Sequence, residues 1–128
     1  MSAFLSDEWL VEAGAALAAL PEVEGADAVV QYTVSGTPEG KVQAHVVVQS
    51  GRVHLEAGKH HEPDCTVSFN YPEAVALFRG DLTPDVAFMS GQAKVEGDHR
   101  VWLLDLRLVR ASEQMGEALE ALRETTTT

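Results

Sequence analysis

The sequence predicts one compact domain that combines helices with an antiparallel β-sheet. Apolar side chains recur every three or four residues over 6–20 and again over 113–123, which is the helical period. Between them, residues 29–71 are rich in β-branched side chains and are interrupted by turn residues, which is typical of strands. With 128 residues, the chain has the length of one autonomous domain, so we expect a single domain over 1–128.

The first expected element is an amphipathic helix over residues 6–20. Ser6 is a favourable N-cap, and two acidic residues follow it in the first turn. Leu10 and Leu17 fall on one face of this helix, and Pro21 ends it.

Four strands are expected next, as an antiparallel meander. Residues 29–35 and 41–49 flank a cluster of Gly, Thr and Pro and therefore predict a hairpin. Residues 52–58 alternate apolar and polar side chains after a Ser-Gly turn, which predicts a third strand with one buried face. After a polar loop, residues 65–71 predict the fourth strand.

Two short helices and a brief strand follow the meander. Pro72 lies at the first turn of a helix that Gly80 ends. Thr83 is a suitable N-cap for a second helix, which starts with Pro84 and continues toward Gly91. A short strand over 94–96 comes next.

Residues 99–109 fit two structures. Their leucines alternate with charged residues as in a strand, whereas Val101, Leu104 and Leu108 have the spacing of a helix face. The helix over 113–123 is supported by its period and by many Ala, Glu and Leu residues. We expect 1–5 and 124–128 to be flexible ends.

The charge balance and the cysteine content exclude several classes of function. The chain has 20 acidic and 9 basic side chains, a formal net charge of −11, and no basic cluster, so charge-driven binding to nucleic acid or anionic membrane is not expected. The longest apolar stretches fall far short of the run of about 20 residues that spans a bilayer. The single Cys65 and the lack of a secretory signal pattern indicate a cytoplasmic protein.

No recognised catalytic motif occurs in the sequence, so we predict a protein that is not an enzyme. There is no phosphate-binding glycine loop, nucleophile elbow or zinc-protease helix. The only candidate proton-transfer groups are His45, His54 and Asp98, and no two of them form a recognisable pair. We expect His45 to face solvent, because it alternates with Val46 and Val48.

The best metal candidate is the group of His60 and His61 with Cys65 and His54. These histidines lie in a polar loop, and the spacing matches no established ligand pattern, so we predict no metal and no other cofactor. Cys65 is expected to be a small buried hydrophobe rather than a nucleophile.

Residues 86–89 form a short helix that is apolar nearly all round, so we expect every side of it to be covered. Packing into an ordinary core is one explanation. The other is the wall of a ligand cavity, because such cavities are mostly apolar. Composition leaves both open.

A longer motif surrounds this short helix. Residues 80–98 read GDLTPDVAFMSGQAKVEGD, which resembles the signature of the sterol-carrier-protein type 2 family. The segments DCTV at 64–67 and YPEA at 71–74 are similar to the family's fourth strand and following helix. The resemblance covers about 6–122.

The resemblance implies an α+β fold in which helices cover a five-stranded, largely antiparallel sheet, with a hydrophobic cavity between the two layers. It implies non-catalytic binding or transfer of fatty acids, fatty acyl chains, sterols or other polycyclic lipids, and a helix after Asp98. It also places Trp102 near the cavity, whereas we expect Trp9 to lie away from it. The candidate ligand-binding residues are Phe69, Leu77, Phe78, Leu82, Val86, Phe88, Met89, Ser90, Trp102, Leu103 and Leu106.

Two departures from the family pattern narrow the expectation. Ser90 stands where the animal carriers have Gln, and residues 126–128 lack the small-basic-Leu ending of peroxisomal members, so a cytoplasmic bacterial carrier fits best. The alternative is an enzyme or pathway accessory that acts on a hydrophobic metabolite in the same cavity. A homodimer through the helix over 113–123 is also considered, although Glu117 and Glu120 on that helix are typical of a solvated face.

Overall fold

A computed structural model of the chain describes residues 2–20, 22, 27–105 and 110–127. The strands are β1 (Ser2–Ala3), β2 (Ala28–Thr37), β3 (Gly40–Gln49), β4 (Arg52–Ala57), β5 (Cys65–Asn70), β6 (Lys94–Gly97) and β7 (Thr126–Thr127). The helices are α1 (Asp7–Ala18), α2 (Tyr71–Arg79), α3 (Pro84–Met89), the π-helical segment η1 (Val101–Asp105) and α5 (Glu113–Glu124).

Strands β2 to β6 form one sheet in the order β4-β3-β2-β5-β6. Three of its strand pairs are antiparallel, and β2 with β5 is parallel. The α+β class and the five-stranded, largely antiparallel sheet are therefore confirmed. The four-strand meander is wrong in one respect, because β5 pairs with β2 and not with β4. Periodicity identifies strands but carries no information on their partners.

The connection from β4 to β5 crosses the outer face of β3 and β2, and this crossing buries His45. The Nδ1 atom of His45 lies 3.1 Å from the carbonyl oxygen of Gly58, and the His60 amide donates to Gln31 Oε1 at 2.8 Å. The side chains of Gln31 and His45 are consequently only 5% and 8% exposed. His45 does alternate with Val46 and Val48 as predicted, but the crossing loop covers it, so its predicted exposure to solvent is wrong.

The local helix signals act as predicted. Ser6 Oγ accepts from the Trp9 amide at 3.2 Å at the start of α1, and Thr83 Oγ1 accepts from the Val86 amide at 3.3 Å at the start of α3. Gly80 ends α2 with φ of 84°, a left-handed conformation that glycine adopts without strain.

The structure tests two expectations about α3 and η1: that α3 is covered on every side, and that the residues after Asp98 form either a strand or a helix. Val86 and Met89 are 53% and 84% exposed, so the expectation that every side of α3 is covered is wrong. Residues 99–105 are helical, which confirms the structure that the family resemblance implied and excludes a strand there. The Asp98 carboxylate accepts from the Arg100 amide at 3.2 Å near the helix start. Leu106 lies outside the described residues.

The two ends of the chain pair with each other in the structure, and the flexibility expected for residues 1–5 and 124–128 stays a prediction. Strands β1 and β7 are parallel neighbours, and the Phe4 amide donates to Thr127 O at 2.9 Å. Trp9 Nε1 donates to Thr126 Oγ1 at 2.9 Å, and Phe4 packs against the Trp9 ring. Two aromatic side chains near the N-terminus thus supply the burial that holds both ends.

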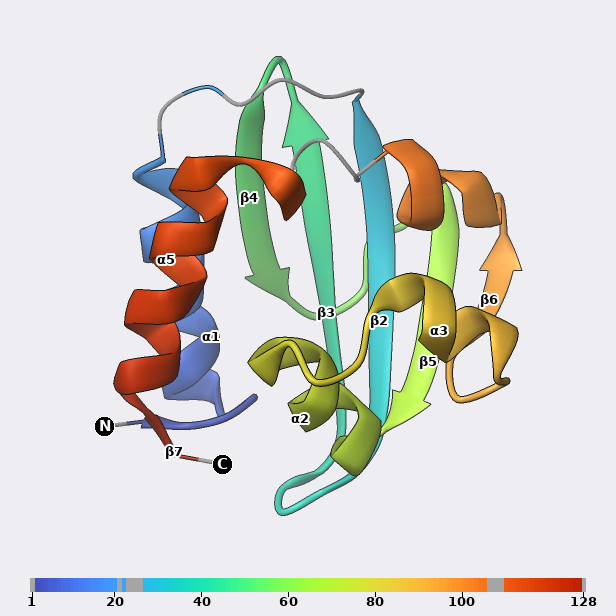
Figure 1. The fold of residues 1–128 in the computed structure, drawn as a ribbon, viewed down its shortest axis with the longest axis horizontal. Helices are drawn as coiled ribbons and strands as arrows, with labels where there is room; N and C mark the ends of the chain where they lie inside the picture. The colour runs from blue at the N-terminus through green and yellow to red at the C-terminus, as the bar shows by residue number, and fades with distance from the viewer. Residues whose placement is uncertain (1, 21, 23–26, 106–109, 128) are drawn as a thin grey trace.

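Figure 1 shows α2, α3 and α5 in front of the sheet, α1 beside β4, and the two termini next to each other. The buried side chains form two clusters under the helices, one around Val30, Val67 and Trp102 and one around Phe4, Trp9 and Ala74. Among the described residues, no helix has the length and apolar character that crossing a membrane requires.

Candidate ligand cavity

A cavity of about 300 Å³ lies between the two hydrophobic clusters, with the sheet on one side and the helices on the other. Its volume is at the lower end of the range that small-molecule sites occupy. The register of the strands places all six lining residues of the sheet on one face. The lining residues are Phe4, Leu5, Trp9, Leu17, Tyr32, Val34, Ala44, Val46, Leu55, Phe69, Ala74, Leu77, Phe78, Pro84, Trp102, Arg110 and Leu119.

One end of the cavity is aromatic. The Phe4 ring stacks on Phe78 with centroids 4.7 Å apart, and Trp9 meets Phe78 edge to face at 5.5 Å. The one polar atom of the Trp9 ring is already engaged by Thr126. Large rings that are fixed by each other in this way form a stable apolar wall.

The other end carries the polar groups of the cavity. Trp102 Nε1 donates to the Tyr32 hydroxyl oxygen at 3.0 Å, and Trp102 itself is only 2% exposed. Arg110 Nη1 donates to Trp102 O at 2.6 Å, and Arg110 Nη2 donates to Leu103 O at 3.3 Å. These bonds fix the guanidinium beside the indole and the phenol. We refer to Tyr32, Trp102 and Arg110 as the polar end.

Burial is the main influence on the pKa of two side chains, Tyr32 and Cys65. It raises the pKa of Tyr32 to about 12, although the positive charge of Arg110 and the Trp102 hydrogen bond act in the opposite direction. Burial also raises the pKa of Cys65 to about 11. The thiol is therefore protonated at neutral pH, which agrees with the prediction of a small buried hydrophobe and disfavours a nucleophile.

These two shifts predict that stability falls in alkaline solution. The folded chain keeps both protons to a higher pH than the unfolded chain, so it binds more protons between pH 9 and 12, and the free energy of unfolding decreases as pH rises through that window. For Tyr32 the shift corresponds to about 3 kcal/mol. Urea unfolding at pH 8 and pH 11 measures the loss. Tyr32→Phe should show a smaller loss than the wild type, and an equal loss would contradict the assignment.

The structure brings four of the candidate residues to this cavity. Phe69, Leu77, Phe78 and Trp102 line it. Leu82 lines a separate shallow pocket against α2. Phe88, Met89 and Leu103 line a surface groove instead, Val86 and Ser90 are exposed, and Leu106 is not described.

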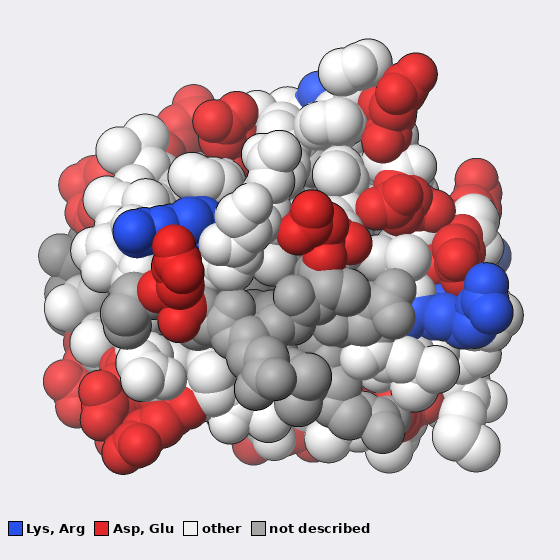
Figure 2. Space-filling view, turned by 90° about the horizontal axis from the view of Figure 1, so that it is seen from above, with Lys and Arg blue, Asp and Glu red and all other residues white. Residues whose placement is uncertain are grey.

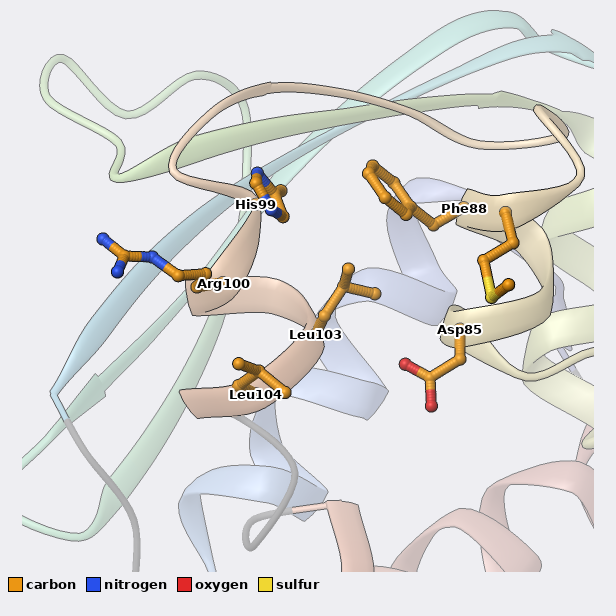
Figure 3. A pocket seen from close by; sticks show the side chains of 7 residues that line it. Asp85, Phe88, His99, Arg100, Leu103 and Leu104 are labelled. Atoms are coloured by element: carbon orange, nitrogen blue, oxygen red, sulfur yellow. The ribbon is translucent and has the colours of Figure 1, made fainter.

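The surface groove separates α3 from the helical segment after Asp98. It has a volume of about 380 Å³, and Met89 and Leu104 on its walls are 84% and 51% exposed. Figure 3 shows Phe88 and Leu103 pointing into the same space from these two elements. The Phe88 ring stacks on His99 with centroids 5.4 Å apart. Phe88 and Met89 thus differ in environment, as expected of successive helical residues, but neither lines the inner cavity.

None of the candidate proton-transfer groups lines the inner cavity. His45 is on the outer face of the sheet, where its Nε2 lies 3.6 Å from Glu56 Oε2. His54 is exposed on the same face. Asp98 is exposed and bonded to Arg100, whose side-chain hydrogen bond lowers the pKa of this carboxyl, so Asp98 is a poor proton donor at neutral pH.

The candidate metal ligands that the sequence analysis weighed do not lie together at one site. The rings of His60 and His61 stack 4.8 Å apart over the outer face, whereas Cys65 is 2% exposed and packs in the core beneath the helices. Over the residues that the structure describes, no group of three or more His, Cys, Asp or Glu side chains could hold a metal ion.

Sequence reasoning missed most of the cavity wall. Val34, Ala44, Val46 and Leu55 carry a usable signal, because their alternation places them on the apolar face of the sheet. That signal does not distinguish a cavity wall from a packed core. Trp9 was expected to lie away from the cavity and instead lines it. It does so because α1 packs on the same face of the sheet, where Gly14 lets the helix approach Leu55 O.

The chain thus combines an α+β fold with an apolar cavity between the sheet and the helices. The chain belongs to the SCP-2 sterol transfer family, whose model matches residues 10–103. The family that the sequence motif resembles is thereby confirmed. A search among curated protein sequences finds no significant match to this chain.

Solved structures share the fold. A crystal structure of sterol carrier protein 2 has a TM-score of 0.63 at 16% identity, covering 94% of this chain and 98% of its own. The solution structure of palmitated SCP2L2 from Aedes aegypti has a TM-score of 0.58 at 21% identity, covering 91% and 94%. A double mutant of the sec-alkyl sulfatase PisA1 has a TM-score of 0.55 at 18% identity, covering 70% of this chain and 14% of the sulfatase, so the fold also forms part of a larger enzyme.

Proposed function

We propose that this protein is a non-catalytic carrier that binds fatty acids, fatty acyl chains or other hydrophobic ligands in the inner cavity. The observation that carries the proposal is the apolar cavity of about 300 Å³ between the sheet and the helices. Membership of the SCP-2 sterol transfer family supports it. The Aedes aegypti relative of the same fold was solved in a palmitated form, which supports the fatty-acyl class.

Burial of an alkyl chain supplies enough free energy for this role. Each buried methylene contributes about 0.8 kcal/mol, so about ten of them approach the 8 kcal/mol of micromolar binding before ordering costs are counted. No chemical step is needed. A carrier must also release its ligand, and an affinity of this order permits release.

The location of the titratable groups favours a carrier over an enzyme. Within the described part of the chain, the cavity wall contains no histidine or carboxylate, and Cys65 is held as a neutral thiol. An enzyme or pathway accessory stays the alternative, and mass spectrometry of ligand incubated with the protein would reveal turnover.

The surface charge agrees with a carrier of small molecules. Acidic side chains are spread over the face in Figure 2, where basic side chains are few. A net charge of −11 opposes binding to nucleic acid and anionic lipid surfaces. The cytoplasmic location, the bacterial source and the homodimer stay predictions. On α5, the exposed Glu117, Glu120 and Glu124 fit a solvated face better than a contact.

Both tryptophans should report ligand binding, because both line the cavity. Trp9→Phe leaves Trp102 as the only indole, and Trp102→Phe leaves Trp9. We expect the emission of each variant to change saturably on titration with dodecanoic acid, since the bound ligand would lie against each ring. Calorimetry on the wild type supplies the independent affinity. Absence of saturable binding in both measurements would refute the carrier function.

A further inference from the structure

We propose that the polar end of the cavity selects ligands with an acidic head group and holds that head inside the fold, with the alkyl tail directed toward the aromatic end. This inference rests on the proposed carrier function. It assigns to Tyr32 and Arg110 the recognition of a carboxylate, and it ranks fatty acids above neutral lipids with a single hydroxyl group.

The Tyr32 hydroxyl is prepared to donate a hydrogen bond into the cavity. Its oxygen already accepts from Trp102 Nε1 at 3.0 Å, which turns the hydroxyl proton away from the indole. Among the residues that the structure describes, no acceptor takes that proton. Since Tyr32 lies within β2, the central strand of the sheet, its hydroxyl projects from the floor of the cavity and not from its rim. A ligand oxygen would complete the hydrogen bonding of this hydroxyl.

Arg110 adds a positive charge to the same place. The carbonyl oxygens of Trp102 and Leu103 position its guanidinium, and its positive charge is close enough to act to lower the pKa of Tyr32. In an apolar wall, a cation attracts an anionic ligand more strongly than it would in water. Hydrogen bonds between a guanidinium and a carboxylate are also stronger than those between neutral groups.

At the opposite end, the lining residues offer no comparable group: the Arg123 guanidinium lies 5.9 Å from the Phe78 ring centroid, but it donates to Phe78 O and does not line the cavity. Phe4 and Phe78 are hydrocarbon rings, and the indole nitrogen of Trp9 donates to Thr126. An amphiphile therefore gains hydrogen bonds in only one of its two orientations. Tyr32 and Trp102 lie within residues 10–103, which the family model matches, whereas Arg110 lies beyond them, so the cation of the polar end is not part of what that match describes.

The head-group test compares two ligands of equal chain length, dodecanoic acid and 1-dodecanol, by calorimetry at pH 8. The wild type should bind the acid at least about tenfold more tightly than the alcohol. Arg110→Met should lower the affinity for the acid to that for the alcohol. Tyr32→Phe should weaken acid binding severalfold. Arg52→Met is the matched control, because Arg52 is an exposed cation that lies outside the cavity and bonds only weakly to Leu20 O at 3.4 Å.

The outcomes separate this inference from the carrier function. Equal affinity of the wild type for acid and alcohol would overturn the head-group assignment and leave the carrier standing. If neither dodecanoic acid nor 1-dodecanol binds, both the head-group assignment and the carrier function are overturned. Circular dichroism shows whether Arg110→Met is folded. If Arg110→Met is not folded, Tyr32→Phe and Arg110→Lys replace it in the test. Arg110→Lys keeps the positive charge and should keep the preference for the acid over the alcohol. Complete loss of that preference in Arg110→Lys, together with an unchanged preference in Tyr32→Phe, would contradict the assignment to charge.

The orientation is tested with brominated acids, since bromine quenches an indole only at short range. 2-Bromododecanoic acid should quench Trp102 in Trp9→Phe more than it quenches Trp9 in Trp102→Phe. 12-Bromododecanoic acid should give the reverse order. The opposite pattern with both acids would show that the head lies at the aromatic end, and would refute the inference.

Discussion

Ala44→Leu should reduce the affinity for dodecanoic acid at least about tenfold while the protein stays folded. Ala44 faces the cavity from β3, directly across the ladder from Tyr32. A leucine side chain there would occupy space that the ligand needs, and filling an apolar cavity commonly raises the free energy of unfolding by about 0.5–2 kcal/mol. Loss of binding in Ala44→Leu with unchanged or increased stability would show that the ligand binds in this cavity in the wild type.

The neighbouring strand supplies a control for this substitution. Ala57 on β4 is the ladder partner of Ala44, but it is exposed and does not line the cavity. Ala57→Leu adds the same atoms one strand away and should leave the affinity unchanged. Calorimetry gives the affinities, and urea unfolding gives the stabilities. If Ala44→Leu binds dodecanoic acid as tightly as Ala57→Leu does, the ligand lies elsewhere and the cavity is only a packing defect.

Gly97→Ala should lower the free energy of unfolding by about 3 kcal/mol. Gly97 ends β6 with φ of 90°, in the region that disfavours side chains, and a Cβ there would lie 2.7 Å from Asp64 O and 3.2 Å from Cys65 Cα. The left-handed conformation alone costs an alanine about 1–2 kcal/mol, and the contact with backbone atoms cannot be relieved by rotation of a side chain.

Gly91→Ala isolates the conformational part of that loss. Gly91 has φ of 79°, yet nothing lies within 4 Å of its hypothetical Cβ. Its substitution should cost about 1 kcal/mol. Urea unfolding gives the loss in the free energy of unfolding for each variant. The difference between the two losses is the cost of placing a Cβ where β6 closely approaches the start of β5. Equal losses in the two variants would mean that the backbone at Asp64 moves aside without cost.

The helix boundaries were predictable because their causes are local. Ser6 and Thr83 cap helices through amides three residues away, and Gly80 ends α2 through its own backbone freedom. The same holds for the strand segments, whose composition is visible without knowledge of their partners. The motif over 80–98 added the family and the helix after Asp98, where periodicity favoured neither structure.

The candidate site was predictable only in part. The motif led to Phe69, Leu77, Phe78 and Trp102, which do line the cavity. It also directed attention to α3, whose Val86, Phe88 and Met89 lie outside it. Proximity in sequence to a family signature places a residue in the right region, but it does not establish which way its side chain points.

By itself, the sequence determined the α+β class, the order of the elements from α1 to α5, the caps of α1 and α3 and the family, since each depends on residues within a few positions or on a contiguous motif. Only the tertiary structure decided that β5 pairs with β2, that a loop buries His45, and that the two ends hold each other. It also brought Tyr32, Trp102 and Arg110 together around one cavity. Contacts of this kind join residues tens of positions apart, and their stability depends on the burial achieved by the whole chain, which no local pattern encodes.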